Sequence, residues 1–443
     1  MTSARAQLGV DRTFALMFLV MLTVAAANTA LQSVLPALGR SLGVRDQAVA
    51  AAFSVSALLW VLAAPFWANR SDRYGRRAMI LLGMGGLVTS LLVCGVFLAL
   101  GINGVIPGAT AFGLFIFGRL IYGSLGAAAP PAVQALVAGS TTREQRTKAL
   151  TLLASAFGLG TILGPAIAPY LILGSIGAVE IGLSGPAFIM ALFSLAILFT
   201  VRAMLPDDRP QPGEGGAQSA YPSIGGAPSG GSVRAATAPK GEAVGFLDPR
   251  VRAWMITGLV MGHAQAMTSQ AIGFLVIDRL QLAPAQALEP TGIVLMMGAG
   301  ASLLVQWGII PLLNLNPRQL VLAGLGIAAA GMALTGIATS LYGIATAFAL
   351  ASLGFGFARP GFTAGSSLAV GPEGQGSVAG KVTSINGASF VLGPSIGVAL
   401  YQAQHSLPYL TAAAASLVMI GYCWATLRGD EAQPGTGSEP GRD

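Results

Sequence analysis

The chain has 443 residues, of which 54% are hydrophobic and 9% are charged, and its formal net charge is +7 at pH 7. Soluble domains carry about 25% charged residues, so this composition excludes an ordinary soluble enzyme, a secreted disulfide scaffold and a disordered chain. The basic residues lie between apolar runs rather than on one face. This distribution argues against a nucleic-acid partner and is typical of a protein in a lipid bilayer.

Apolar runs long enough to cross a bilayer, which takes about 20 residues, recur along the whole chain. They lie near 13–35, 47–68, 78–100, 107–137, 147–173 and 184–203, and then near 251–276, 288–310, 319–339, 341–370, 379–401 and 407–427. The segment 204–250 between the two sets is rich in Pro, Gly and Ser and cannot bury a core. We therefore predict an all-α membrane protein of twelve transmembrane helices. It would comprise an N-terminal half (1–203), a flexible linker (204–250) and a C-terminal half with a short tail (251–443).

The orientation follows from the basic residues of the short loops, which favour the cytoplasmic side. The loops after the second and fourth runs hold Arg70, Arg73, Arg76, Arg77, Arg143, Arg146 and Lys148, whereas the opposite side offers only Arg40, Arg45 and Arg279. We expect both termini and the linker to be cytoplasmic. Phe14 to Ala27 also resembles a signal peptide with a cleavage site. We favour an uncleaved first helix, because cleavage would leave an odd number of spans.

The fifth and eleventh runs share a sequence pattern. GLGTILGPAIAPYL from Gly158 and GASFVLGPSIGVAL from Gly387 match at a fixed offset of 229, and Ser124-Leu125-Gly126 finds a counterpart in Ser352-Leu353-Gly354. Parallel six-helix repeats are typical of a carrier whose halves rock around a central site. The alternative is chance similarity between apolar sequences.

Three motifs in this order resemble a known family. The loop Trp67–Arg77 is similar to the signature loop of the major facilitator superfamily, Arg119-x-x-x-Gly123 to its fourth-helix motif, and Gly160-x-x-x-Gly164-Pro165 to the fifth-helix motif of its exporters. Ala68 and Ala168 depart from glycines of these patterns. The resemblance implies the major facilitator fold and, within it, the twelve-span drug:proton antiporters of the tetracycline-resistance type. It also implies the inner (plasma) membrane and a monomer.

The resemblance implies gating residues at two places. In the loop, Asp72 can meet the positive end of the eleventh helix near Lys381, and Arg73, Gly75, Arg76 and Arg77 would complete a latch. A purely topological basic loop is the alternative. In the repeat, Gly160, Gly164, Pro165, Gly393 and Pro394 predict a hinge, close helix packing, or both.

Ionisable residues at membrane depth are costly and usually functional. The candidates are Arg119, His263 and Arg359, and no acid lies clearly within a run. Related drug exporters carry an acid in the first helix, where this chain has Asn28 and Gln32. We expect proton coupling to involve Arg119 and His263, since a histidine titrates near neutral pH. A guanidinium stays charged, so Arg119 would hold an anionic group or act on a neighbour. A histidine used only for packing is the alternative.

Polar and aromatic side chains among small residues suit a bulky amphipathic ligand. The predicted substrate-binding residues are Asn28, Gln32, Tyr122, Gln134, His263, Gln270, Gln306, Arg359 and Asn386. An ordinary interhelical hydrogen bond is the alternative for each of them.

Other classes of function have little support. The segment Gln375–Val382 lacks the first glycine and final Ser or Thr of a P-loop, which argues against an ATP-driven pump. Two histidines and no spanning carboxylate argue against an enzyme, a metal site or a cofactor. We predict a secondary transporter that exports an amphipathic small molecule or drug in exchange for protons. The alternative is an exporter or importer of a native metabolite, such as a sugar or siderophore, with other or no proton coupling. A channel or sensor of the same architecture stays open.

Overall fold

The computed structural model describes residues 2–141, 143–207, 243–313, 315–371 and 374–427. Within these ranges the chain is almost entirely helical. The N-terminal half contains α1 (Thr2–Ser41), α2 (Asp46–Tyr74), α3 (Arg76–Ile102), α4 (Gly108–Leu125), α5 (Ala129–Ser140), α6 (Arg143–Ile167) and α7 (Gly185–Met204). The C-terminal half contains α9 (Arg252–Leu280), α10 (Leu288–Leu303), α11 (Ile310–Leu313), α12 (Pro317–Ile337), α13 (Leu341–Leu368), α14 (Gln375–Ala403) and α15 (Leu407–Thr426).

Two predicted spans are built from more than one helix. A 3₁₀ turn, Gly126–Ala128, joins α4 to α5, and a π-helical segment, Leu304–Ile309, joins α10 to α11. Ten segments of the described chain are long and apolar enough to cross a membrane. With α6 and α9 they give twelve, which confirms the predicted fold class. Helices are expected here, because backbone groups in lipid must be hydrogen-bonded within the segment.

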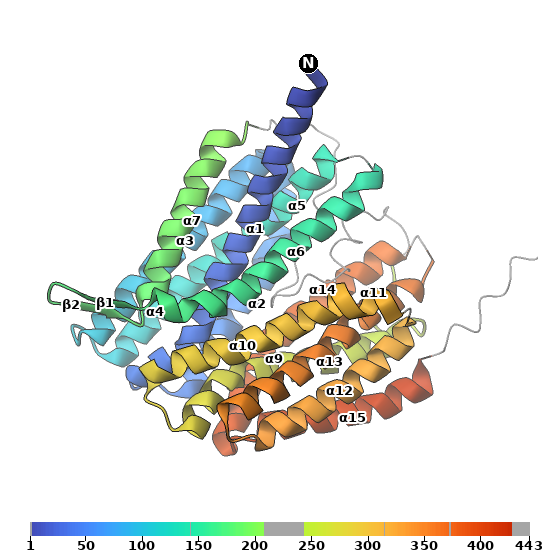
Figure 1. The fold of residues 1–443 in the computed structure, drawn as a ribbon. Coiled ribbons are helices and arrows are strands. Elements are labelled where there is room, and N and C mark those ends of the chain that lie inside the picture. The colour runs from blue at the N-terminus through green and yellow to red at the C-terminus, as the bar shows by residue number, and fades with distance from the viewer. Residues whose placement is uncertain (1, 142, 208–242, 314, 372–373, 428–443) are drawn as a thin grey trace, which may run out of the picture.

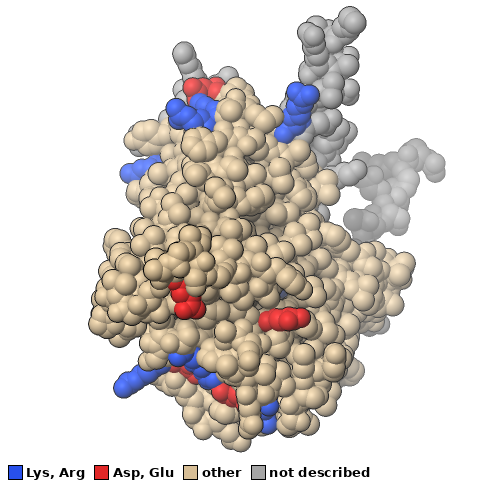
Figure 2. Space-filling model, turned by 60° about the vertical axis from the view of Figure 1, so that its left-hand side comes forward, with Lys and Arg blue, Asp and Glu red and all other residues tan. Residues whose placement is uncertain are grey.

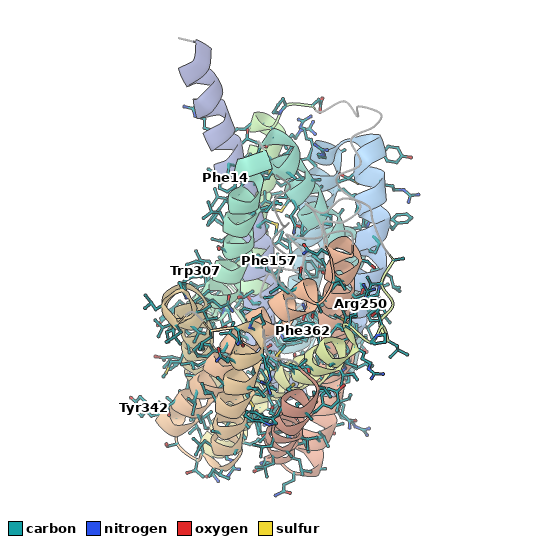
Figure 3. All side chains as sticks on the ribbon, turned by 90° about the vertical axis from the view of Figure 1, so that its right-hand side faces the viewer. Phe14, Phe157, Arg250, Trp307, Tyr342 and Phe362 are labelled. Atoms are coloured by element: carbon teal, nitrogen blue, oxygen red, sulfur yellow. The ribbon has the colours of Figure 1, made fainter. Side chains whose placement is uncertain are left out.

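The two halves pack against each other through α1 with α9 and α10, α2 with α14, and α6 with α10. Figure 1 shows them meeting near the C-terminal ends of α1 and α9 and spreading apart toward the ends at which α6 and α14 begin. Most of the face in Figure 2 carries neither acidic nor basic side chains, and the charged ones gather mainly toward its two ends. Trp307 and Tyr342 project from the outer surface of the C-terminal half (Figure 3), as expected for side chains facing lipid.

Two details differ from the sequence-based expectations. α9 continues to Leu280, beyond the expected end of the seventh run near 276, so Asp278 lies in the last turn of that helix. A short hairpin, β1 (Leu173–Ile176) paired antiparallel with β2 (Val179–Gly182), stands between α6 and α7 and was not predicted. Four-residue strands give too short a pattern to be recognised beside long apolar helices.

Candidate functional site

The polar centre of the N-terminal half is Arg119 of α4, which is 3% exposed. Its guanidinium donates to Asn28 Oδ1 of α1 at 2.8 Å and to Ser56 Oγ of α2 at 3.4 Å. The guanidinium carbon lies 5.0 Å from the centre of the Phe53 ring and 4.8 Å from that of Tyr122. Two predicted residues besides Arg119 therefore meet here, and the surrounding rings and dipoles stabilise the buried charge.

The C-terminal half has a separate centre at Arg359 of α13, which is 4% exposed. Arg359 donates to Gln265 Oε1 of α9 and, at 3.4 Å, to Asn386 Oδ1 of α14. The structure thus joins the predicted residues Arg359 and Asn386 and adds Gln265. Sequence reasoning missed Gln265, although an amide two residues from His263 in an apolar helix was a visible signal.

The two halves are linked by side chains of α1 and α9. Gln32 Nε2 donates to Gln270 Oε1 at 3.1 Å, which brings two predicted substrate-binding residues together. Further along the same helices, Arg40 forms an ion pair with Asp278 and a second one with Asp46 of α2 at 2.8 Å. Both links lie toward the end at which the halves meet, so they hold that end closed.

Two residues of the C-terminal half complete the Asp278 cluster. Tyr401 of α14 donates its hydroxyl to Asp278 Oδ2 at 2.6 Å. His405 stacks on the Tyr401 ring at 4.8 Å, with its Nε2 3.7 Å from the same carboxylate oxygen. Sequence reasoning missed this cluster. The available signal was a pair of opposite charges at the corresponding ends of the first and seventh spans.

The repeated glycines pack helix against helix in the same way in both halves. A Cβ on Gly164 of α6 would lie 2.2 Å from Thr29 Oγ1 of α1, and one on Gly160 would lie 2.4 Å from the Leu22 carbonyl oxygen. In α14, a Cβ on Gly393 would lie 2.6 Å from Ala266 Cβ of α9. The close packing is therefore evident, whereas a hinge at Pro165 or Pro394 stays a prediction.

The remaining predicted binding residues lie apart from these centres or at their edges. His263 has its Nδ1 2.8 Å from the Leu259 carbonyl oxygen and 3.4 Å from Ser389 Oγ. Gln306 donates to Ser302 Oγ at 3.2 Å in the π-helical segment. Gln134 is buried in α5. None of these contacts joins the residues to Arg119 or Arg359, so the described structure does not assemble all the predicted side chains in one cluster.

The predicted latch is described only in part. The side chains of Asp72 and Arg73 lie outside the described residues. Gly75 separates α2 from α3 with a φ of 91°, a conformation that favours glycine. Arg77 pairs with Asp207 and donates to the Arg202 carbonyl oxygen at 2.7 Å, both in its own half, and Arg76 lies beside Gly139.

Lys381 of α14 and the loop before α9 lie at the same end of the C-terminal half. Lys381 Nζ donates to Ser377 Oγ at 3.2 Å. In the loop, side-chain hydrogen bonds from Arg250 (Figure 3) lower the pKa of Asp248 to about 2, so this carboxylate is charged at neutral pH. No group of three or more His, Cys, Asp or Glu side chains that could hold a metal occurs in the described part of the chain.

Comparison with known proteins supplies a family and several relatives. The profile of the Major Facilitator Superfamily matches residues 17–394. The chain is 32% identical to the class B tetracycline resistance protein of Escherichia coli over 145 residues, which are 33% of this chain and 31% of that protein. It is 35% identical to multidrug resistance protein 2 of Bacillus subtilis over 115 residues, 26% of this chain and 25% of that one. These matches span a quarter to a third of the relatives' lengths.

Solved structures share the fold at low sequence identity. The crystal structure of the human organic anion transporter MFSD10 is 19% identical, with a TM-score of 0.62, and the match covers 94% of this chain and 99% of that one. An inward-facing, unoccupied bacterial homologue of the human lysosomal transporter Spinster is 11% identical, with a TM-score of 0.68 over 94% and 95% of the two chains.

Proposed function

The chain belongs to the Major Facilitator Superfamily, and from that membership we propose that it is a secondary active transporter that exports an amphipathic small molecule by proton antiport. The family makes it a membrane transporter rather than an enzyme. The direction, the coupling ion and the class of substrate are the proposal. The observation that carries it is the buried polar centre in each half, Arg119 with Asn28 and Arg359 with Gln265. Asn28 and Gln265 lie on α1 and α9, two helices that also pack the halves together.

Alternating access follows from how the halves are joined. The Gln32–Gln270 and Arg40–Asp278 contacts lie toward one end of the molecule, and Figure 1 shows the helices spreading toward the other. The spreading end carries the basic loop at 70–77, which the positive-inside rule places in the cytoplasm. We assign this arrangement to an inward-open state. Breaking the α1–α9 contacts while the other end closes would expose the centre to the opposite side.

The drug-exporter assignment draws on the relatives. Both the tetracycline and the multidrug resistance protein are similar to part of this chain. For proton coupling, His263 supplies an imidazole, and its Nδ1 lies next to Ser389 of α14. Arg119 stays charged and holds Asn28 in place. We further propose that the transporter works as a monomer in the inner membrane with both termini in the cytoplasm.

The experiment is substrate accumulation in energised cells that express the chain, with tetracycline and a lipophilic dye cation as probes. Accumulation is expected to fall relative to cells with an empty vector, and a protonophore is expected to restore it. His263→Ala should abolish the protonophore-sensitive part, whereas His405→Ala, which changes a 52% exposed histidine side chain at the closed end, should keep it. Efflux that a protonophore leaves intact would refute proton antiport.

A second function is favoured by the polarity of the two centres. Buried arginines hydrogen-bonded to amides suit a polar native metabolite as well as a drug. If neither probe moves, the exporter or importer of a native metabolite becomes the leading candidate, and uptake of labelled sugars and siderophores distinguishes its direction.

A further inference from the structure

The Arg359 guanidinium lacks a carboxylate partner in the described structure. Its side-chain contacts there are with two neutral amide oxygens, those of Gln265 and Asn386. The described acids lie elsewhere: Asp46 and Asp278 pair with Arg40, Asp207 with Arg77 and Asp248 with Arg250, while Glu180 and Glu289 are exposed. A buried charge without a counter-ion is costly, which indicates that a group other than the described residues completes the site.

Unpartnered polar atoms lie on Asn386, which contacts this guanidinium, and further along the same side of α13. Asn386 is 1% exposed, and its Nδ2 has no hydrogen-bond partner among the described atoms. Thr363 and Ser367 follow Arg359 on α13 at intervals of four residues, so they continue the same side of the helix. Both are buried, at 5% and 3%, and both hydroxyls are unpartnered there. Because buried polar groups are nearly always hydrogen-bonded, this concentration points to a ligand.

The chemistry of these groups selects the sign of the ligand. The free positions of Arg359 and Asn386 Nδ2 can only donate hydrogen bonds, and the Thr363 hydroxyl can donate one. A carboxylate or sulfonate accepts several such bonds, and an arginine binds it in a fork that a neutral ligand does not match. The Gln265 side chain, half-buried, offers Arg359 the oxygen that an anion would replace.

We propose that Arg359, Asn386 and Thr363 form a subsite for the anionic group of an amphipathic ligand, so that the exported compounds include organic anions. This inference rests on the proposed export function and narrows its substrate class. The Nε of Arg119 is also without a partner among the described residues, but two aromatic rings and Asn28 lie against that guanidinium, whereas Arg359 has only the two amide oxygens there.

Ligand binding to the purified full chain in detergent tests the subsite without requiring transport. The probes are naphthalene-2-sulfonate, its neutral isostere naphthalene-2-sulfonamide, and inorganic sulfate. The readout is the dependence of the thermal unfolding midpoint on probe concentration, which gives an apparent affinity. We expect the sulfonate to raise the midpoint at concentrations at which the sulfonamide and sulfate do not.

Variants locate the binding. Arg359→Gln should weaken sulfonate binding about ten- to hundredfold, as expected for the loss of charge-assisted hydrogen bonds. Arg359→Lys should keep part of it, and Asn386→Ala and Thr363→Val should each weaken it severalfold. The control Arg252→Gln removes the same charge from an exposed position at the start of α9 and should bind as the wild type does. If Arg359→Gln does not fold, the Asn386 and Thr363 variants decide the outcome.

Three results would overturn the proposal: no stabilisation by the sulfonate, equal stabilisation by the sulfonamide, or undiminished binding in the Arg359, Asn386 and Thr363 variants. Equal stabilisation by sulfate would assign the subsite to an inorganic anion and overturn the organic-anion substrate. None of these results bears on export itself, which the accumulation experiment tests separately. A chain that exports the dye cation but binds no sulfonate would retain the proposed function and lose this inference.

Discussion

The two halves are alike where helices pack and different where charge is buried. Gly164 brings α6 onto α1 and Gly393 brings α14 onto α9 through equivalent close contacts. The central arginines have unlike surroundings: Arg119 lies against two rings, whereas Arg359 has only amide oxygens within hydrogen-bonding reach in the described structure. The repeated glycine segments of α6 and α14 therefore give both halves the same helix packing, whereas residues outside these segments give the two arginines different surroundings.

The junction between the halves follows the same symmetry. Gln32 and Gln270 are 238 residues apart, as are Arg40 and Asp278, so the two contacts lie in the same register along α1 and α9. Two identical amides can pair, since each donates and accepts. Two identical charges would repel, and the junction is closed by opposite ones instead.

The largest expected effect concerns the shared packing. Gly164→Ala and Gly393→Ala should each lower the free energy of unfolding by about 1–3 kcal/mol, because each added Cβ overlaps a neighbouring helix. Thermal unfolding in detergent measures the change. Gly85→Ala is the control, since a Cβ there meets no atom within 4 Å. Tolerance of one substitution but not the other would show that the two halves do not pack alike.

A somewhat smaller effect is expected at the junction. Asp278→Asn removes the negative charge that the C-terminal half contributes to the junction. Arg40 stays paired with Asp46, so the fold should survive. Losing this ion pair with its hydrogen bonds, between side chains that are each 22% exposed, costs about 1–2 kcal/mol, which would shift the equilibrium away from this state roughly five- to thirtyfold. Ser54 of α2 and Ser395 of α14, whose Oγ atoms are 2.8 Å apart, provide the readout.

With both serines replaced by cysteine, the yield of a disulfide between α2 and α14 reports how often these helices are together. The yield should fall in Asp278→Asn and stay unchanged in Asp248→Asn, whose carboxylate binds Arg250 within one half. The native Cys94 and Cys423 are buried and do not compete. An unchanged yield in Asp278→Asn would mean that the ion pair does not hold this end closed.

The difference between the arginine centres predicts different tolerance of lysine. Arg119→Lys keeps the charge but loses the planar group that faces the Phe53 and Tyr122 rings, and about 1 kcal/mol of stability should go with it. Arg359→Lys loses no contact with an aromatic ring. Its free energy of unfolding should therefore lie within a few tenths of a kcal/mol of the wild-type value. The unfolding midpoints of the two variants test this, and equal losses would remove the distinction between the centres.

Much of the fold could be predicted from sequence, because span length and loop charge are properties of single segments. The twelve helices could be predicted in this way. Arg119 and Asn28 could each be identified as candidate site residues, because each is a polar residue within an apolar run. The pairing of Arg359 with Gln265 could not be predicted, since an apolar helix gives no periodicity to say whether His263 or Gln265 faces α13. The Arg40–Asp278 pair depended on where α9 ends, and helix ends are the least certain feature of a sequence.

The smallest effect expected is at Tyr401, which tests whether the junction depends on charge or on hydrogen bonding. Tyr401→Phe removes one hydrogen bond to Asp278 and leaves Arg40 in place. A typical hydrogen bond contributes about 0.5–1.5 kcal/mol, and the low end applies to the 22% exposed Asp278 side chain, so the disulfide yield between α2 and α14 should fall less than in Asp278→Asn. His405→Ala should lower it still less, because that ring is 52% exposed and 3.7 Å from the carboxylate. A larger loss in Tyr401→Phe than in Asp278→Asn would make the tyrosine, not the ion pair, the main contact that closes this end.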